Sequence, residues 1–147
     1  HQVKDISEFL GDIELNEDLG RVEKRVAYHD ACHLAHGQQV RTQPRALLKK
    51  IPGVELVELA ESDWCCGSAG IYNITHPEMA DKLLNRKVRH ISKASPEIVA
   101  TGNPGCMLQI RLGMQREGLE VDVLHPVQLL DRAYQASIGN QSSERSM

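Results

Sequence analysis

Four short apolar or alternating segments recur along the chain, each followed by a helical pattern, and this alternation is what most constrains the fold. Short, continuously apolar segments suit strands that are buried on both faces, as in parallel sheets. Helices between parallel strands form right-handed crossovers and cover both faces of the sheet. The sequence therefore predicts an α/β domain with a small doubly wound parallel sheet of about four strands and helices on both faces. The predicted strands are residues 25–28, 54–59, 98–101 and 121–124.

Residues that favour helix ends mark the predicted helices. The spacing of Thr75 and Glu78 is that of a capping box with a proline in the first turn, which predicts a helix start. Asn103 followed by Pro104 predicts an N-cap and a first helical position, and Gly118 predicts the end of the same helix. Two further helices are predicted to start at Pro44 and at Pro126.

The chain of 147 residues suits one domain of this kind, with a short extension at each end. In residues 1–21, apolar side chains recur at helical spacing before an acidic stretch, so we expect an amphipathic helix and a linker. Residues 22–138 form the cysteine-containing domain. Residues 139–147 are polar and predict a flexible tail.

Charge and composition argue against several classes of partner. The net charge of −3 and the aromatic content of 3% do not favour a nucleic-acid surface. No apolar run approaches the ~20 residues that a membrane-spanning helix needs, and the first residues do not resemble a signal peptide. We therefore expect a cytoplasmic domain that binds no nucleic acid and does not span a membrane. Any contact with the inner face of the membrane would be made through a larger complex.

The four cysteines, Cys32, Cys65, Cys66 and Cys106, follow three of the four predicted strands. In a doubly wound sheet the carboxyl ends of the strands lie at one edge, where ligands bind. A domain of this size does not need disulfides, so a metal or cluster site is the favoured interpretation. Thiolates bind zinc, copper(I) and iron–sulfur clusters. The alternative is that each cysteine is simply a small buried apolar residue.

The residues around the cysteines fit a metal or cluster site. Cys106 falls near the third position of the helix that Asn103 opens, where the helix dipole favours thiolate. Gly67 and Gly70 follow the adjacent cysteine pair and would let backbone amides approach a bulky inorganic group. Alternatively, these two glycines only build a turn.

Histidines gather around the first cysteine. His33, next to Cys32, is the best candidate for an additional ligand or a hydrogen-bonding partner of one. For His29 a hydrogen-bonding role at the strand end is favoured, and for His36 a surface role. His125 follows the fourth predicted strand and either faces the same layer or shapes a turn.

Three segments in order resemble the cysteine-rich CCG domain over about residues 22–136: YHDACHLAHGQ, DWCCGSAGIYNITHPEMADKLLNRK and ATGNPGCMLQI. This domain occurs in subunits of heterodisulfide reductase and of anaerobic glycerol-3-phosphate dehydrogenase, and in the iron–sulfur subunit of glycolate dehydrogenase (glycolate oxidase). The resemblance is greatest to the C-terminal part of the last of these. The family's pattern is Cys, then CCG, then CxxC; four of its five cysteines are matched, and the fifth position is Asn103.

The resemblance implies an electron-transfer domain in which Cys32, Cys65, Cys66 and Cys106 hold an iron–sulfur cluster of [4Fe–4S] type. Four thiolates suffice for one such cluster, or for a tetrahedral zinc ion as the alternative cofactor. The implied partners are the ferredoxin-like part of its own subunit and a flavin-containing subunit, which alone carries FAD and oxidises glycolate to glyoxylate. No motif points to catalysis by the chain itself. A structural zinc domain or a subunit-interaction domain without a redox role remains the alternative.

Overall fold

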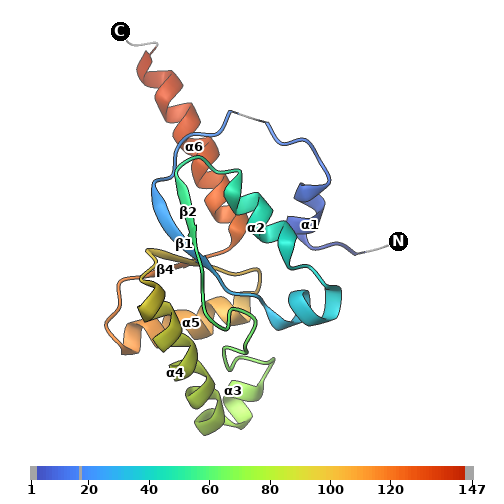
Figure 1. Cartoon of the computed structure of the whole chain (residues 1–147), viewed down its shortest axis with the longest axis vertical. Helices are drawn as coiled ribbons and strands as arrows, with labels where there is room; N and C mark the ends of the chain where they lie inside the picture. The colour runs from blue at the N-terminus through green and yellow to red at the C-terminus, as the bar shows by residue number, and fades with distance from the viewer. Residues whose placement is uncertain (1–2, 17, 145–147) are drawn as a thin grey trace.

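The computed structural model describes residues 3–16 and 18–144, with side chains described as far as Gly139. Strands and helices alternate through most of the chain, as the sequence predicts (Figure 1). The elements are α1 (Ile6–Gly11), β1 (Lys24–Tyr28), the π-helical turn η1 (His33–Gln38), α2 (Thr42–Lys49), β2 (Val54–Val57), α3 (Tyr72–Thr75), α4 (Pro77–Ala94), β3 (Ile98–Ala100), α5 (Pro104–Arg116), β4 (Asp122–Leu124) and α6 (Pro126–Glu144).

The four strands form one parallel sheet in the order β2-β1-β3-β4, which confirms the predicted fold class. Val26 of β1 lies in register with Leu56 of β2 and with Ile98 of β3. Strand β1 is therefore central and β2 is an edge strand. The observed strands begin or end within two residues of the predicted bounds; β2 stops at Val57 although Leu59, two residues later, is buried.

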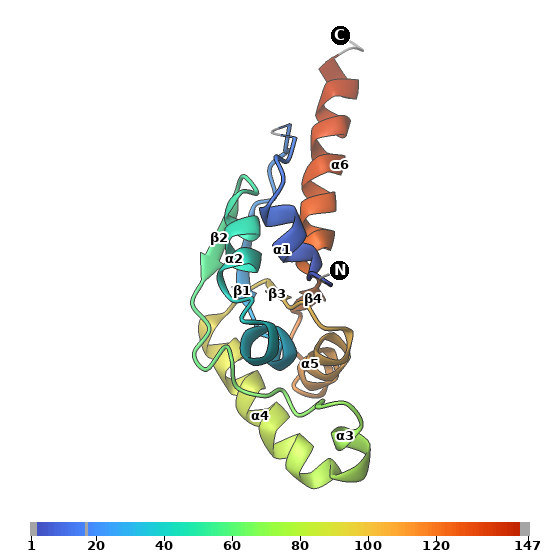
Figure 2. The ribbon, with the colours of Figure 1, turned by 90° about the vertical axis from the view of Figure 1, so that its right-hand side faces the viewer.

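Successive residues of the strands face opposite sides of the sheet, and each side is covered by helices. Val26 and Tyr28 pack with residues of α2 and α6, and α1 adds Leu10 at the margin of this cluster. Ala27 and Val99 face the other side, where η1, α4 and α5 pack. In Figures 1 and 2, α6 extends away from the body at one end of the molecule and α3 lies at the other.

The helix-end predictions are confirmed for α5; for α4 the predicted start with a proline in the first turn is confirmed, but the predicted capping box is wrong. The Asn103 side chain accepts a hydrogen bond from the backbone N–H of Cys106, and Gly118, with φ of +63°, follows the end of α5. Helix α4 begins at Pro77, and in this described part of the chain no side-chain hydrogen bond caps it. Thr75 belongs to α3, so its hydroxyl donates to the carbonyl of Ile71 at 3.3 Å instead of capping α4.

The N-terminal end contains the helix that the sequence predicts, and the C-terminal end is more helical than the sequence indicates. Helix α1 lies within the segment where an amphipathic helix is expected. Helix α6 continues to Glu144 and so includes residues 139–144, which we expected to belong to the tail. Residues 1–2, 17 and 145–147 of the predicted terminal segments lie outside the described residues. Among the helices that the structure describes, none is long and apolar enough to cross a membrane.

Candidate metal centre

The candidate site lies where the connections from the central strands diverge. From β1 the chain passes to β2 on one side and then crosses to β3 on the other side of β1. The carboxyl ends of β1 and β3 therefore flank the topological switch point, which is where doubly wound sheets bind ligands. His29 directly follows β1, Cys66 lies in the loop after β2, and Cys106 lies in the first turn of α5 after β3.

Three side chains meet at this edge of the sheet. The ligand atoms of His29, Cys66 and Cys106 all lie within 4.8 Å of one another, and all three residues are buried. Each comes from a different segment of the chain, so the fold and not a local motif brings them together. Two thiols and one imidazole are a donor set that suits zinc or an iron–sulfur cluster.

Cys65 joins this group through hydrogen bonds between thiols. The Cys65 thiol donates a hydrogen bond to the sulfur of Cys66, and the Cys66 thiol donates one to the sulfur of Cys106. All three cysteines are free thiols. The bond to Cys106, together with burial, raises the pKa of Cys66 to about 11. The bond to Cys66, then burial, raises the pKa of Cys65. Without a metal these two thiols are protonated at neutral pH, so metal binding there must release protons.

Backbone amides already point at the sulfurs. The N–H of Gly67 donates to Cys65 Sγ at 3.3 Å, and the backbone of Ser68 hydrogen-bonds to Cys66. Hydrogen bonds of this kind to sulfur tune the potential of a bound iron–sulfur cluster. The turn after the cysteine pair therefore presents N–H groups in the arrangement expected for such a site.

Gly67 and Gly70 serve this turn differently. Both have positive φ, +92° and +66° respectively. A Cβ on Gly67 would lie 2.5 Å from the carbonyl oxygen of Ala80, so the absence of a side chain lets the turn lie against α4. A Cβ on Gly70 would meet nothing within 4 Å among the described residues. Direct contact of either glycine with a cofactor remains a prediction.

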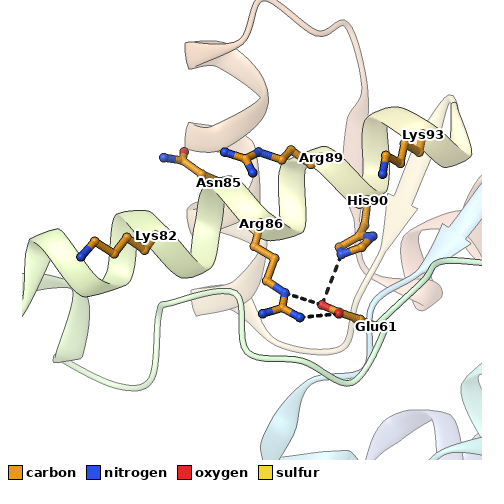
Figure 3. A pocket seen from close by; sticks show the side chains of 7 residues that line it. All are labelled: Glu61, Lys82, Asn85, Arg86, Arg89, His90 and Lys93. Atoms are coloured by element: carbon orange, nitrogen blue, oxygen red, sulfur yellow. Dashed lines mark hydrogen bonds and ion pairs between the residues drawn. The ribbon is translucent and has the colours of Figure 1, made fainter.

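Helix α4 holds the loop that carries the cysteine pair. The ammonium group of Lys87 is buried and donates to the carbonyl oxygens of Glu61 and, at 3.4 Å, of Ser62. The Glu61 carboxylate pairs with Arg86 at 2.6 Å and with His90 at 3.2 Å, as Figure 3 shows. These bonds fix the start of the loop to one face of α4.

Lys87 also places a positive charge inside the site. Burial lowers its pKa, and the nearby Cys66 acts in the opposite direction. A cation close to a thiol favours the deprotonated, metal-binding form of the sulfur. Lys87 is therefore suited to compensate the negative charge that thiolate ligands bring into a buried site.

The start of α5 positions Cys106. The Asn103 side chain accepts from the N–H of Cys106 at 3.0 Å, which places the cysteine at the third helical position, as predicted. A Cβ on Gly105 would lie 2.8 Å from the hydroxyl oxygen of Ser68. The first turn of α5 thus packs directly against the turn that follows the cysteine pair.

Not every predicted ligand joins the three-residue group. Among the described residues, Cys32 and His33 are exposed and lie outside this group. His36 is exposed too, with Nδ1 at 3.1 Å from the Arg41 guanidinium, as its predicted surface role requires. His125 Nδ1 accepts from the N–H of Val127 at 3.2 Å, which agrees with a residue that shapes a turn.

His29 is the group member for which the sequence favoured another role. Burial, and then the charge of Lys87, lowers the pKa of His29 to about 3, so its imidazole is neutral near pH 7. Neutral imidazole is the form that binds metals. The available signal was position: His29 directly follows the central strand, next to the switch point.

Comparisons with known proteins identify a family and several relatives. The model of the cysteine-rich CCG domain family matches residues 26–111. The chain is 41% identical over 133 residues to a Bacillus subtilis protein named "probable glycolate oxidase iron-sulfur subunit", and the match covers 88% of the chain and 30% of that protein. It is 43% identical to a Methanothermobacter marburgensis protein named as a subunit of fumarate reductase (CoM/CoB), over 90% of the chain and 27% of that protein.

A third relative is lactate utilization protein A of Oceanobacillus iheyensis, which is 35% identical over 86% of the chain and 52% of that protein. The chain thus spans between about a quarter and a half of the length of these relatives. The family match covers more than half of the chain and includes Cys32, the cysteine pair and Cys106. The chain therefore belongs to the CCG family of cysteine-rich domains.

Proposed function

We propose that the chain is an electron-transfer domain in which Cys32, Cys65, Cys66 and Cys106 hold an iron–sulfur cluster of [4Fe–4S] type. The observation that carries this proposal is the convergence of Cys66 and Cys106, with Cys65 bonded to Cys66, at the carboxyl edge of the sheet. Cys32 is the proposed fourth thiol; it is exposed and directly precedes η1.

The residues present fit such a cofactor. Cysteine sulfurs are the usual ligands of these clusters, and backbone N–H groups of Gly67 and Ser68 already bond to two of them. Lys87 supplies a compensating positive charge. When bound, the cluster would accept and release single electrons. The chain's own residues hold the cluster, limit access of water and set its potential through hydrogen bonds and charge.

The larger assembly is a proposal drawn from the relatives. One is named as an iron–sulfur subunit of a glycolate oxidase, and we propose that this chain is the corresponding C-terminal part of such a subunit in a glycolate dehydrogenase complex. Electrons would come from a partner subunit that carries FAD and oxidises glycolate to glyoxylate. The ferredoxin-like part of the same subunit would be the neighbouring carrier. We also propose that the complex lies in the cytoplasm, at the inner face of the membrane.

Anaerobic reconstitution of the purified chain with iron and sulfide tests the cofactor assignment. We expect about four irons per chain, as a [4Fe–4S] cluster requires, with an EPR signal on reduction. Cys66→Ser and Cys106→Ser should each lose most of the iron. A wild-type chain that takes up no cluster, or variants that load as fully as wild type, would contradict the proposal.

The spacing of the ligand atoms favours one alternative, a structural zinc ion. Ligand atoms within 4.8 Å of one another approach the separation that bonds of ~2.3 Å from sulfur to a single metal impose. Cys65 is placed to be a fourth ligand beside His29, Cys66 and Cys106. Zinc titration with thermal melting separates the two: a tight, redox-silent ion with no iron uptake would favour the structural role.

A further inference from the structure

His29 occupies the most constrained position in the candidate site. It follows the central strand β1, and its backbone N–H donates to the carbonyl of Ala100 at the end of β3, 2.8 Å away. The side chain is only 1% exposed. The backbone therefore fixes the ring at the switch point, between the two strands whose ends border the site.

Only one of the two ring nitrogens of His29 has a hydrogen-bond partner among the described residues. The backbone of Ser62 hydrogen-bonds to the ring. Nδ1 has no hydrogen-bond partner among the residues that the structure describes. The bond to Ser62 therefore involves the other nitrogen, Nε2. Because a backbone carbonyl can only accept a hydrogen bond, Nε2 is the donor that carries the hydrogen, and Nδ1 keeps its lone pair.

A buried nitrogen with an unused lone pair needs an explanation, since such groups are almost always bonded in native proteins. The thiols of Cys66 and Cys106 are close, yet within the described structure neither donates a hydrogen bond to Nδ1. A metal is the partner that satisfies a lone pair and two neighbouring sulfurs together.

The distances are close to those that a shared metal ion imposes. Metal–sulfur bonds are ~2.3 Å and metal–nitrogen bonds ~2.0–2.1 Å, so ligand atoms on one metal lie no more than about 4.6 Å apart. The three ligand atoms here lie within 4.8 Å of one another. The second bond of the ring, to a backbone carbonyl, is the type that orients metal-binding histidines and sets their tautomer.

We infer that His29 is a fifth ligand of the metal centre, through Nδ1 and beside the four cysteines, so that the centre has mixed sulfur and nitrogen ligation. The inference rests on the proposed function. Among the described residues, His33 is exposed and outside the ligand group, and Asn103 is committed to capping α5 through the N–H of Cys106. His29 is thus the non-cysteine side chain that the fold directs at the centre.

Mixed ligation has a chemical consequence. A neutral imidazole brings less negative charge to iron than a thiolate does, and replacing thiolate by histidine raises the reduction potential of an iron–sulfur centre. His29 is therefore expected to raise the potential of the centre relative to one with thiolate ligands alone. The same reasoning predicts that a His29→Cys variant has a lower potential.

Hyperfine spectroscopy tests the ligand directly. The chain is produced with ¹⁵N-labelled histidine and with natural histidine, loaded anaerobically with iron and sulfide, reduced, and studied by pulsed EPR. We expect a strongly coupled nitrogen whose frequency changes with the label. His29→Cys should lose this coupling, keep most of its iron and show a lower midpoint potential. The matched control His33→Gln should keep the coupling.

The outcomes separate this inference from the proposed function. Iron bound without a histidine coupling overturns the inference and leaves the cluster assignment intact. A coupling that disappears in His33→Gln assigns the ligand to His33 and also overturns it, even if His29→Cys does not fold. A wild-type chain that binds no cluster overturns both.

Discussion

Gly67 and Gly70 share a left-handed backbone but differ in what surrounds them. Gly67 faces the backbone of Ala80 on α4, and Gly70 faces open space as far as the described residues reach. Both are thus favoured as glycine by conformation, and Gly67 is also required by packing. The candidate site therefore depends on the small size of Gly67 as well as on the side chains that could bind a metal.

Replacing Gly67 by alanine should be much more destabilising than replacing Gly70. An alanine in the left-handed region costs about 1–2 kcal/mol at either position. At Gly67 the contact of 2.5 Å with the Ala80 carbonyl adds an overpacking cost of about 1–3 kcal/mol. Urea unfolding of the metal-free proteins measures both changes. Equal losses of stability in the two variants would contradict the packing role of Gly67.

Lys87 should influence the potential of the loaded centre. Its buried positive charge lies close to Cys66 and favours the more negative, reduced state of a cluster. Lys87→Met should therefore lower the midpoint potential, by on the order of 1 kcal/mol or ~40 mV for one electron. A redox titration followed by EPR measures the shift at matched iron content. The exposed Lys82→Met variant is the control, and a similar shift in both variants would argue against a local effect of Lys87.

Helices α4 and α5 fix the two sides of the candidate metal centre. Helix α4 binds the loop after β2 through Lys87 and Glu61, whereas α5 carries Cys106 itself. The helices also pack on each other: a Cβ on Gly113 of α5 would lie 2.6 Å from Val88 of α4. The geometry of the centre is therefore tied to the packing of two long elements and not to loops alone.

The cap of α5 should be measurable in stability. Asn103 satisfies the N–H of Cys106, so Asn103→Ala is expected to cost about 1 kcal/mol, and Asn103→Ser should recover most of it. Chemical unfolding of the metal-free chain gives the difference. If alanine and serine behave alike, the side-chain cap does not contribute as proposed.

At the scale of the whole molecule, two apolar clusters on opposite faces of the sheet hold the domain together. Among the described residues, the cluster that includes Ala27 is the one that also contains residues of the candidate metal centre, namely Cys66 and Cys106. The other cluster, with Val26 and Tyr28, is separate from the site. Most of the fold is thus independent of the cofactor.

Removing the metal should leave the sheet folded. We expect near-native far-UV circular dichroism in chelator and a higher melting temperature on loading, because a ligand present at about 1,000 times its Kd adds about 4 kcal/mol. Cys106→Ser should show no such increase. Hydrogen exchange should be fastest in the loops after Cys32 and around Gly67–Gly70 and should slow on loading. A chain that is unfolded without metal would contradict this division.

The sequence predicts the parallel sheet because its strands are short, apolar and separated by helices, a pattern that depends on local composition. It does not predict that Thr75 ends α3, because a threonine can either cap a helix or form part of one. Here the short helix α3 includes Thr75, so the residue does not cap α4. It does not predict the π-helical turn η1, which leaves Cys32 and His33 exposed.

His29 illustrates the same limit for the site. Its residue type and its place after β1 were visible, but the choice between a hydrogen-bonding role and a ligand role depends on the strand order. Only the adjacency of β1 and β3 brings Cys106 to its ring, and only the loop after β2 adds Cys66. Such long-range placement is not encoded in any local pattern.

The strand order also has a consequence for how the protein is made. More than half of the chain separates His29 from Cys106, so the ribosome produces the first of these candidate ligands long before the last. Until α5 has emerged, the early cysteines are thiols without their partners, at risk of oxidation or of binding the wrong metal. With the proposed ligands, we expect the centre to be loaded only after nearly the whole domain has been synthesised, so that cofactor binding would mark a completed domain.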